Sequence, residues 1–99
     1  MAEPGTSADV SVVVVTFNAL PWLERCLESV RGYETIVVDH GSTDGTVELV
    51  RSRFPDARLI EQENRGFGAG NNAGMRAATA TYALLLNSDA WVVARSEEH

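Results

Sequence analysis

Hydrophobic residues in this chain form short runs, and three of these runs stop at clusters of small polar and acidic residues. The clusters are Thr16-Phe17-Asn18, Asp39-His40-Gly41-Ser42 and Asn87-Ser88-Asp89. Short, strongly apolar runs are typical of parallel strands that helices cover on both faces. Ligands of open α/β sheets bind beyond the carboxyl ends of the strands. The pattern therefore predicts half of a nucleotide site at the three polar clusters.

The same pattern predicts alternating strands and helices. Strands are expected over residues 10–17, 34–39, 58–62 and 82–86, where apolar and β-branched residues gather. Helices are expected between them: one from about Leu20 to Gly32, one after the possible caps Ser42-Thr43-Asp44, and one from the glycine-rich segment to about Ala78. This alternation is typical of right-handed βαβ crossovers that build a parallel, Rossmann-like α/β sheet. We expect a disordered leader at 1–9, a half-domain at 10–93 and a tail at 94–99.

Composition limits the class of protein. The chain has 99 residues, of which 44% are hydrophobic, which suits at most one small domain. No apolar run approaches the ~18 residues that a membrane span needs, and the N-terminus lacks the features of a signal peptide. The single cysteine, Cys26, suits a reducing compartment and a packing role. The cytoplasm is the default location, and attachment at the inner face of the membrane stays open.

The net charge of −6 argues against a nucleic-acid partner, because the eight basic residues are scattered and form no basic patch. The same acidity opposes any phosphate ligand, since a like-charge contact at about 4 Å costs ~4 kcal/mol at an effective dielectric constant of 20. A phosphate site would therefore need a positive partner. Arg65 is one candidate and a bound cation is the other.

Asp39 closes a predicted strand, so its carboxylate is expected to project from the sheet edge toward a base or ribose. The competing interpretation is a turn aspartate that caps the next helix. His40 is interpreted as a solvated turn residue. Trp22 and Trp91 are assigned to packing, because bulky aromatic residues near the ends of elements mostly contact their neighbours.

The glycine-rich segment 64–74 allows close approach of the backbone and presents N–H groups at a helix N-terminus, which favours anions. Its sequence does not match the dinucleotide-binding fingerprint, and the chain contains no P-loop motif. These absences disfavour nicotinamide or flavin dehydrogenases and exclude P-loop enzymes.

Asn87 and Asp89 lie two residues apart after a predicted strand, a spacing that suits a hard cation such as Mg²⁺ or Mn²⁺. The competing interpretation is an ordinary polar turn that binds no ion. A cation here would solve the charge problem that the acidic chain creates for a phosphate ligand.

Four segments in order, VVVVTFNALPWLERCLESV, IVVDHGSTDGTVELV, ENRGFGAGNNAGMRAA and LLLNSDA, closely resemble the N-terminal, nucleotide-binding half of family 2 glycosyltransferases. These are inverting enzymes with the GT-A fold. The third and fourth segments look most like bacterial rhamnosyltransferase-type members that build cell-wall or surface polysaccharide. The resemblance implies a dTDP- or UDP-sugar donor, a saccharide acceptor and a DxD-like element that binds Mg²⁺ or Mn²⁺.

The resemblance also implies roles for single positions. The implied donor-binding residues are Thr16, Phe17, Asn18, Asp39, Gly41, Ser42, Arg65, Gly66, Asn72, Asn87 and Ser88, and the implied metal ligands are Asp89 and Asn87. His40 departs from the usual Asn or Asp, and no catalytic residue is assigned.

The acceptor site and general base of the family lie downstream of the DxD-like element, in residues that this chain does not possess. We therefore expect a fragment that binds a nucleotide-diphosphate sugar without transferring it. An alternative from a different class is a non-catalytic interaction fragment, a possible homo-oligomer, that pairs through the exposed edge of its fourth strand. A nucleotidyltransferase-like domain is a third interpretation, disfavoured because the first strand is not followed by a glycine-rich basic loop.

Overall fold

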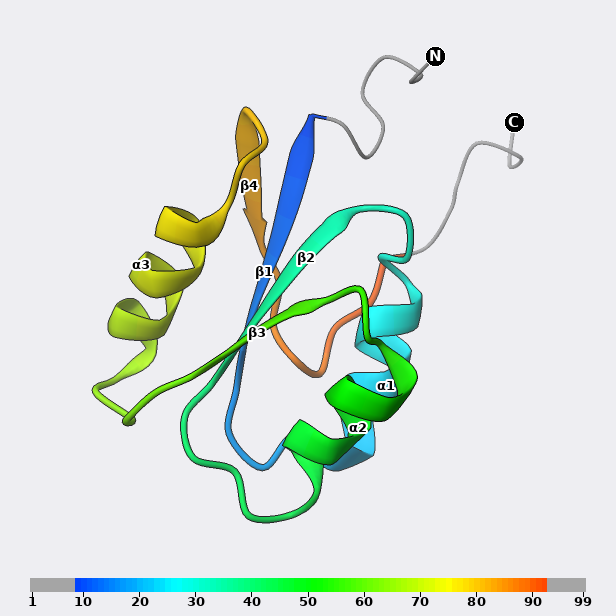
Figure 1. The fold of residues 1–99 in the computed structure, drawn as a ribbon, viewed down its shortest axis with the longest axis vertical. Helices are drawn as coiled ribbons and strands as arrows, with labels where there is room; N and C mark the ends of the chain where they lie inside the picture. The colour runs from blue at the N-terminus through cyan, green and yellow to red at the C-terminus, as the bar shows by residue number, and fades with distance from the viewer. Residues whose placement is uncertain (1–8, 93–99) are drawn as a thin grey trace.

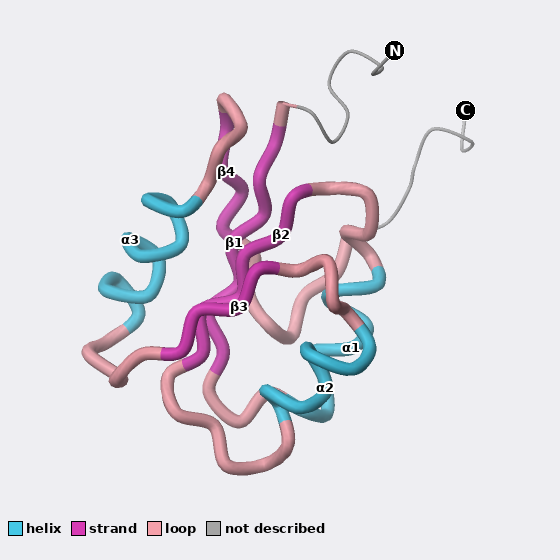
Figure 2. Tube along the Cα trace, in the orientation of Figure 1, coloured by secondary structure: helices cyan, strands magenta, loops and turns pink. Residues whose placement is uncertain are grey.

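The computed structural model describes residues 9–92 and has four strands and three helices in alternation (Figures 1 and 2). The elements in chain order are β1 (Val10–Thr16), α1 (Leu20–Glu28), β2 (Glu34–Asp39), α2 (Thr46–Arg53), β3 (Arg58–Glu61), α3 (Phe67–Ala77) and β4 (Tyr82–Leu85). The predicted leader, apart from Asp9, and the predicted tail lie outside the described residues. The predicted strands are confirmed to within one residue at each end.

All strand pairs are parallel, and the strand order is β3-β2-β1-β4. The Rossmann-like α/β prediction is therefore confirmed. The chain first moves outward from β1 to β2 and β3, and then returns to place β4 on the other side of β1. The reversal makes the β1/β4 boundary the topological switch point, which is the usual ligand position in sheets of this kind.

The helices form two layers, with α1 and α2 on one face of the sheet and α3 on the other (Figure 1). Alternate residues of β1 supply the two faces, as the period of a strand requires. On the α1/α2 face, side chains from both helices and both central strands form one cluster: Val12, Val14, Ala19, Leu23, Cys26, Leu27, Val30, Val37, Val50 and Phe54. This cluster is the larger part of the core.

The α3 face has a smaller cluster of Val13, Ile36 and Val38, against which alanines of α3 pack. α3 lies very close to β1 because Gly70 and Gly74 face the sheet. A Cβ atom at Gly74 would lie 2.2 Å from Cγ1 of Val13. These two glycines therefore serve close helix–sheet packing, one of the uses that glycine has at a close backbone approach.

β4 differs from the fully covered strand that its leucine run predicts. Tyr82, Leu84 and Leu85 are 67%, 42% and 43% exposed. β4 pairs with β1 along one edge, and no strand within residues 9–92 pairs with its other edge. The uncharged strand thus leaves apolar surface open within residues 9–92. No helix in this range is long and apolar enough to cross a membrane.

Candidate functional site

An open cleft of about 500 Å³ lies at the carboxyl-terminal edge of the sheet, and we call it the carboxyl-edge cleft. The segments that follow β1, β2 and β4 meet there with the segment that begins α3. The lining residues are Val15, Thr16, Phe17, Asn18, Ala19, Trp22, His40, Asn64, Phe67, Asn87, Ser88 and Asp89. The structure thus brings together, at the switch point, polar clusters that lie far apart in the sequence, 16–18 and 87–89.

The segment after β1 contributes both a polar and an aromatic group to the carboxyl-edge cleft. Phe17 is 56% exposed. Asn18 has a positive φ of 51°, a conformation that asparagine tolerates better than most residues. The side-chain Oδ1 of Asn18 accepts a hydrogen bond from the backbone amide of Thr43 at 2.8 Å. The backbone amide of Asn18 donates to Ser42 Oγ, also at 2.8 Å. The loops after β1 and β2 are therefore fastened to each other.

Asp39 does not project into open space as expected. Its residue is 1% exposed, and its carboxylate accepts four hydrogen bonds. Oδ1 receives the hydroxyls of Thr16 and Ser42, both at 2.6 Å, while Oδ2 receives the amides of Gly41 at 3.1 Å and Ser42 at 2.9 Å. A buried carboxylate must be satisfied in this way. Asp39, Gly41 and Ser42 thus organise the loop behind the cleft, and their contact with a donor stays a prediction.

Of the three predicted helix caps, Asp44 is the one that bonds the start of α2, and it also serves α1. α2 begins after Gly45, and Asp44 Oδ1 accepts from the Thr46 amide at 3.0 Å. The other oxygen, Oδ2, accepts from the amide of Leu20 at 3.1 Å, in the first turn of α1. The Thr46 hydroxyl, together with these amides, lowers the pKa of the Asp44 carboxyl. One carboxylate therefore fixes the start of both helices beside the carboxyl-edge cleft.

The interpretation of His40 as a solvated residue is wrong. The residue is 4% exposed, and its Nε2 lies 3.2 Å from Nε2 of Gln62. Its backbone amide donates to the carbonyl of Thr16 at 2.9 Å, which extends the β1–β2 pairing by one residue. The ring is therefore built into the wall of the carboxyl-edge cleft because α3 closes over it from the other side.

The segment after β4 places Asn87, Ser88 and Asp89 along the carboxyl-edge cleft. Asn87 and Asp89 are exposed. The Cys26 thiol of α1 lies beneath them and donates to the carbonyl of Asn87 at 3.6 Å. Burial, and secondarily the charge of Asp89, raise the pKa of Cys26 to about 11. Cys26 is therefore a protonated packing group, as the sequence predicts, and it supports the loop that carries Asp89.

Arg65 and Asn72 do not line the carboxyl-edge cleft. They open on a separate cavity of about 380 Å³ along α3, together with Arg76. The Arg65 side chain is 76% exposed and pairs with Glu63 at 3.2 Å. Gly66, with a φ of 97°, precedes the first residue of α3 and lines neither space. The predicted counter-charge therefore lies outside the cleft that holds Asp89.

The residues that line the carboxyl-edge cleft suit a cation that takes its remaining ligands from a bound molecule. Asp89 is the one carboxylate among the described lining residues, and no arginine accompanies it. No cluster of three or more His, Cys, Asp or Glu side chains within residues 9–92 could bind a metal alone. Mg²⁺ is commonly held by one or two carboxylates plus phosphate oxygens and water. Asp89 with the Asn87 oxygen suits that arrangement.

Trp22, Asn64 and Phe67 also line the carboxyl-edge cleft, although the sequence analysis assigned none of them to the site. Trp22 and Phe67 are 55% and 57% exposed. Their positions carry a weak signal, because each lies in the first turn of a helix at the carboxyl edge of the sheet. Trp91 contacts Arg25 instead, with the guanidinium carbon 3.9 Å from the ring centre.

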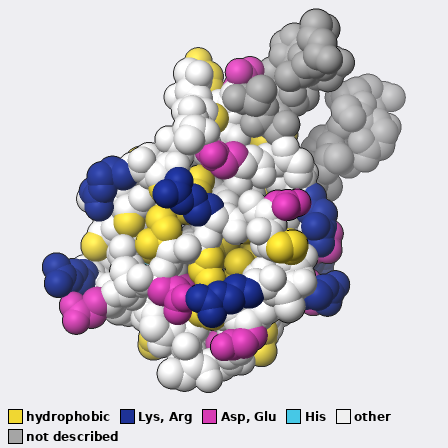
Figure 3. All heavy atoms as spheres, viewed as in Figure 1, with side chains coloured by type: hydrophobic (Ala, Val, Ile, Leu, Met, Phe, Trp, Pro, Cys, Tyr) yellow, Lys and Arg dark blue, Asp and Glu magenta, His cyan; other side chains and the backbone are white. Residues whose placement is uncertain are grey.

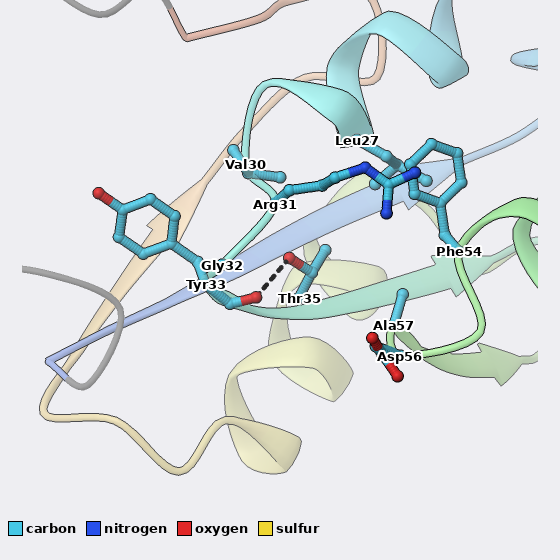
Figure 4. A pocket seen from close by; sticks show the side chains of 9 residues that line it. All are labelled: Leu27, Val30, Arg31, Gly32, Tyr33, Thr35, Phe54, Asp56 and Ala57. Carbon is cyan, nitrogen blue, oxygen red and sulfur yellow. Dashed lines mark hydrogen bonds between the residues drawn. The ribbon is translucent and has the colours of Figure 1, made fainter. Parts of the chain in front are cut away.

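A cavity of about 260 Å³ lies at the opposite edge of the sheet, near the amino ends of β2 and β3 (Figure 4). Arg31 crosses it with its guanidinium over the Phe54 ring, 4.6 Å from the centre. Glu28 accepts two hydrogen bonds from Arg31, at 2.8 and 3.0 Å, which also lowers the pKa of Glu28. The cation is thus already paired, and no predicted site residue lies there.

Residues 11–95 match the family model described as Glycosyl transferase family 2. The chain is 33% identical over 91 residues to glycosyltransferase GlyA of Streptococcus pneumoniae, covering 84% of this chain and 13% of that protein. It is 33% identical over 94 residues to the putative glycosyltransferase EpsH of Bacillus subtilis, covering 84% of this chain and 26% of that protein. The chain thus spans about a quarter or less of these two relatives.

Solved structures of S. aureus TarS are similar to the fold. TarS 1–349 superposes with a TM-score of 0.71 at 26% identity, over 84% of this chain and 28% of that one. TarS 1–349 in complex with UDP-GlcNAc gives the same TM-score and identity, over 84% of this chain and 27% of that one.

Proposed function

Because this chain belongs to glycosyl transferase family 2, we propose that it binds a nucleotide-diphosphate sugar, a UDP- or dTDP-sugar, in the carboxyl-edge cleft. The observation that carries the proposal is the convergence of the β1 and β4 exits at the switch point of the sheet. The similarity to TarS, which was solved with UDP-GlcNAc, supports it.

Each part of the carboxyl-edge cleft has a role in this proposal. Thr16, Phe17 and Asn18 lie beside the nucleobase, where the exposed Phe17 ring offers a face for stacking. Asp39, Gly41 and Ser42 hold the loop that shapes this end. Gly66, Arg65 and Asn72 contact the donor only where its sugar diphosphate extends past the start of α3.

In this proposal Asn87, Ser88 and Asp89 face the diphosphate, and Asp89 and Asn87 would hold a Mg²⁺ or Mn²⁺ ion. This arrangement follows from charge: the cleft has a carboxylate and no arginine among its described lining residues, so a bare diphosphate would be repelled. An ion held by these residues would supply positive charge to balance the diphosphate. Asp89 and Asn87 hold the donor in place, and the Cys26 thiol supports their loop from below.

The proposed reaction of the longer family proteins is inverting transfer of a sugar, rhamnose-like in type, to a saccharide of the cell wall or surface. Such a transfer needs a base for the acceptor hydroxyl. No residue within 9–92 is assigned that role, so the proposal for this chain is limited to binding of the donor.

Calorimetric titration of UDP with and without Mn²⁺ tests the proposal. Wild-type protein should bind UDP at least about tenfold more tightly with the metal, and Asp89→Ala should remove that gain. Glu63→Ala is the matched control, because it removes an exposed carboxylate outside the cleft. Equal metal dependence in wild-type protein and Asp89→Ala would refute the metal assignment, and absence of UDP binding in both would refute the function.

A second candidate function, self-association through β4, is favoured by the exposure of Tyr82, Leu84 and Leu85. A second copy could align its own β4 antiparallel to this strand, since the strand carries no charge to oppose pairing. Light scattering after size exclusion should then show a dimer that Leu84→Lys dissociates. A monomer at all concentrations would contradict this candidate.

A further inference from the structure

The imidazole of His40 is the buried titratable group of the carboxyl-edge cleft that the proposed function does not use. The ring is held on two sides. A Cβ atom placed on Gly70 would lie 2.8 Å from its Nε2 and equally close to Val15. The ring therefore occupies a space that the absence of a side chain in α3 leaves for it.

The hydrogen bond to Gln62 sets which nitrogen of His40 carries the proton. The Nε2 amide nitrogen of Gln62 only donates, so the ring Nε2 at 3.2 Å accepts. A neutral imidazole with an accepting Nε2 has its proton on Nδ1. The arrangement thus makes Nδ1–H a donor.

The donor at Nδ1 keeps a small contact with solvent although the residue as a whole is buried. Among the described residues no buried side-chain nitrogen or oxygen lacks a hydrogen-bond partner. The side-chain hydrogen bond of His40 uses Nε2, so Nδ1 is satisfied by access to solvent. Because His40 lines the carboxyl-edge cleft, that access is through the cleft.

We propose that His40 Nδ1–H donates a hydrogen bond to the C4 carbonyl oxygen of uracil or thymine, and that His40 thereby selects these bases over cytosine. This inference rests on the proposed nucleotide-sugar function. At C4, cytosine has an amino group where uracil and thymine have a carbonyl oxygen. Two donors would then face each other, and a polar site rejects a ligand that leaves its groups unpaired.

The surroundings favour a base over a phosphate as the partner of His40. A neutral ring with one N–H supplies no charge to balance a diphosphate, whereas one donor suits one carbonyl oxygen. Phe17, Trp22 and Phe67 line the same cleft with 55% to 57% of their surface exposed. Exposed aromatic rings provide stacking faces for a planar base. The competing outcome is that His40 donates to a phosphate. The affinity for a nucleotide would then not depend on His40 and the identity of the base together.

Calorimetry with UDP and CDP in the presence of Mn²⁺ tests the selection. Wild-type protein should prefer UDP by about tenfold, and His40→Ala should reduce the preference to less than about twofold. Gln62→Met keeps the ring and removes its hydrogen-bond partner, so the preference should fall in part while the metal dependence stays. Equal affinity of wild-type protein for UDP and CDP would overturn the inference.

Nuclear magnetic resonance of the wild-type imidazoles provides a test that needs no variant. The chain has two histidines, His40 and His99, so assignment is simple. Long-range proton–nitrogen correlations should show His40 protonated at Nδ1, and UDP should shift this nitrogen more than CDP does. A proton on Nε2, or identical shifts with the two nucleotides, would contradict the assignment.

The two proposals fail in different ways. If UDP binds with a metal dependence that Asp89→Ala removes, but UDP and CDP bind equally, the function stands and the role of His40 is refuted. If neither nucleotide binds with Mn²⁺, both are refuted.

Discussion

The two faces of the sheet are packed by different means. On the α1/α2 face, large side chains such as Leu23, Leu27 and Phe54 fill the space between helices and strands. On the α3 face, Gly70 and Gly74 bring the helix backbone against Val13 and Val15. Buried apolar area stabilises the α1/α2 face. On the α3 face, the two glycines determine how closely the helix approaches the sheet. The close approach of α3 also encloses His40 at the wall of the carboxyl-edge cleft.

The largest loss of stability is expected from truncating the central leucine of the α1/α2 face. Leu23→Ala should lower the free energy of unfolding by about 3 kcal/mol, because Leu23 is fully buried and its loss leaves a cavity. Leu20→Ala in the same helix is the matched control, since Leu20 is 38% exposed, and should cost less than about 1 kcal/mol. Urea denaturation measures both. Similar losses would mean that the helix does not pack as described.

On the α3 face, adding a side chain at a glycine should destabilise the protein by overpacking. Gly74→Ala should destabilise by about 2 kcal/mol, because the new methyl group meets Val13 at 2.2 Å. The control Gly68→Ala adds the same methyl group to the same helix where nothing lies within 4 Å, and should stabilise by about 0.5 kcal/mol.

The double variant Gly74→Ala with Val13→Ala should lose less free energy of unfolding than the sum of the two single losses. The smaller side chain at position 13 makes room for the new methyl group at position 74. Thermal unfolding of the single and double variants forms a double-mutant cycle. Strict additivity would contradict direct contact between the two positions.

Glu34 fastens the end of α3 to the sheet. Its carboxylate accepts from the hydroxyl of Ser11 in β1 and from the amide and hydroxyl of Thr79 after α3, at 2.9 and 2.8 Å. These bonds lower the pKa of Glu34, the Ser11 hydroxyl most strongly. A lowered folded-state pKa stabilises the protein above the unfolded value and loses this effect as the pH falls through the folded value.

Glu34→Gln should therefore cost about 1 kcal/mol at pH 7. The difference from wild-type protein should shrink steadily below the ordinary glutamate value of 4.5. Denaturation curves at several pH values check the sign. A deficit that grows in acid would show that the lowered pKa is absent.

The smallest effect is expected from the ion pair between α1 and α2. Arg53 and Glu24 are 2.8 Å apart, with 54% and 46% of their side-chain surface exposed. Arg53→Gln should cost less than about 0.5 kcal/mol, and salt should remove the difference. A loss as large as that of Leu23→Ala would mean that charge, rather than apolar burial, holds this layer.

The two edges of the sheet also differ. β3 begins with Arg58 and ends with Glu61, which pairs with Arg51 of α2. Figure 3 views the side of the molecule that carries β3 in Figure 1, and basic and acidic side chains are interspersed over it. β4 carries no charge. Charged edge strands resist pairing with other chains, so β4 is the edge at which a further strand could add.

The order of elements, and the edge of the sheet at which the polar clusters meet, follow from the sequence alone. Runs such as Val12–Val15 and Ile36–Val38 end at polar clusters, and parallel strands must bring their carboxyl ends to one edge. Thr16, Phe17, Asn18, Asn87, Ser88 and Asp89 were assigned to the site in this way, and they line one cleft. Local patterns suffice here because strand direction fixes where each strand ends.

The tertiary structure alone decided which way individual side chains turn. Asp39 faces inward because Thr16, Gly41 and Ser42 supply donors that no linear pattern reveals. His40 is buried because α3, more than twenty residues later, reaches it through Gly70. Burial and hydrogen bonding depend on neighbours that are distant in sequence, so these features emerge only when the layers pack together.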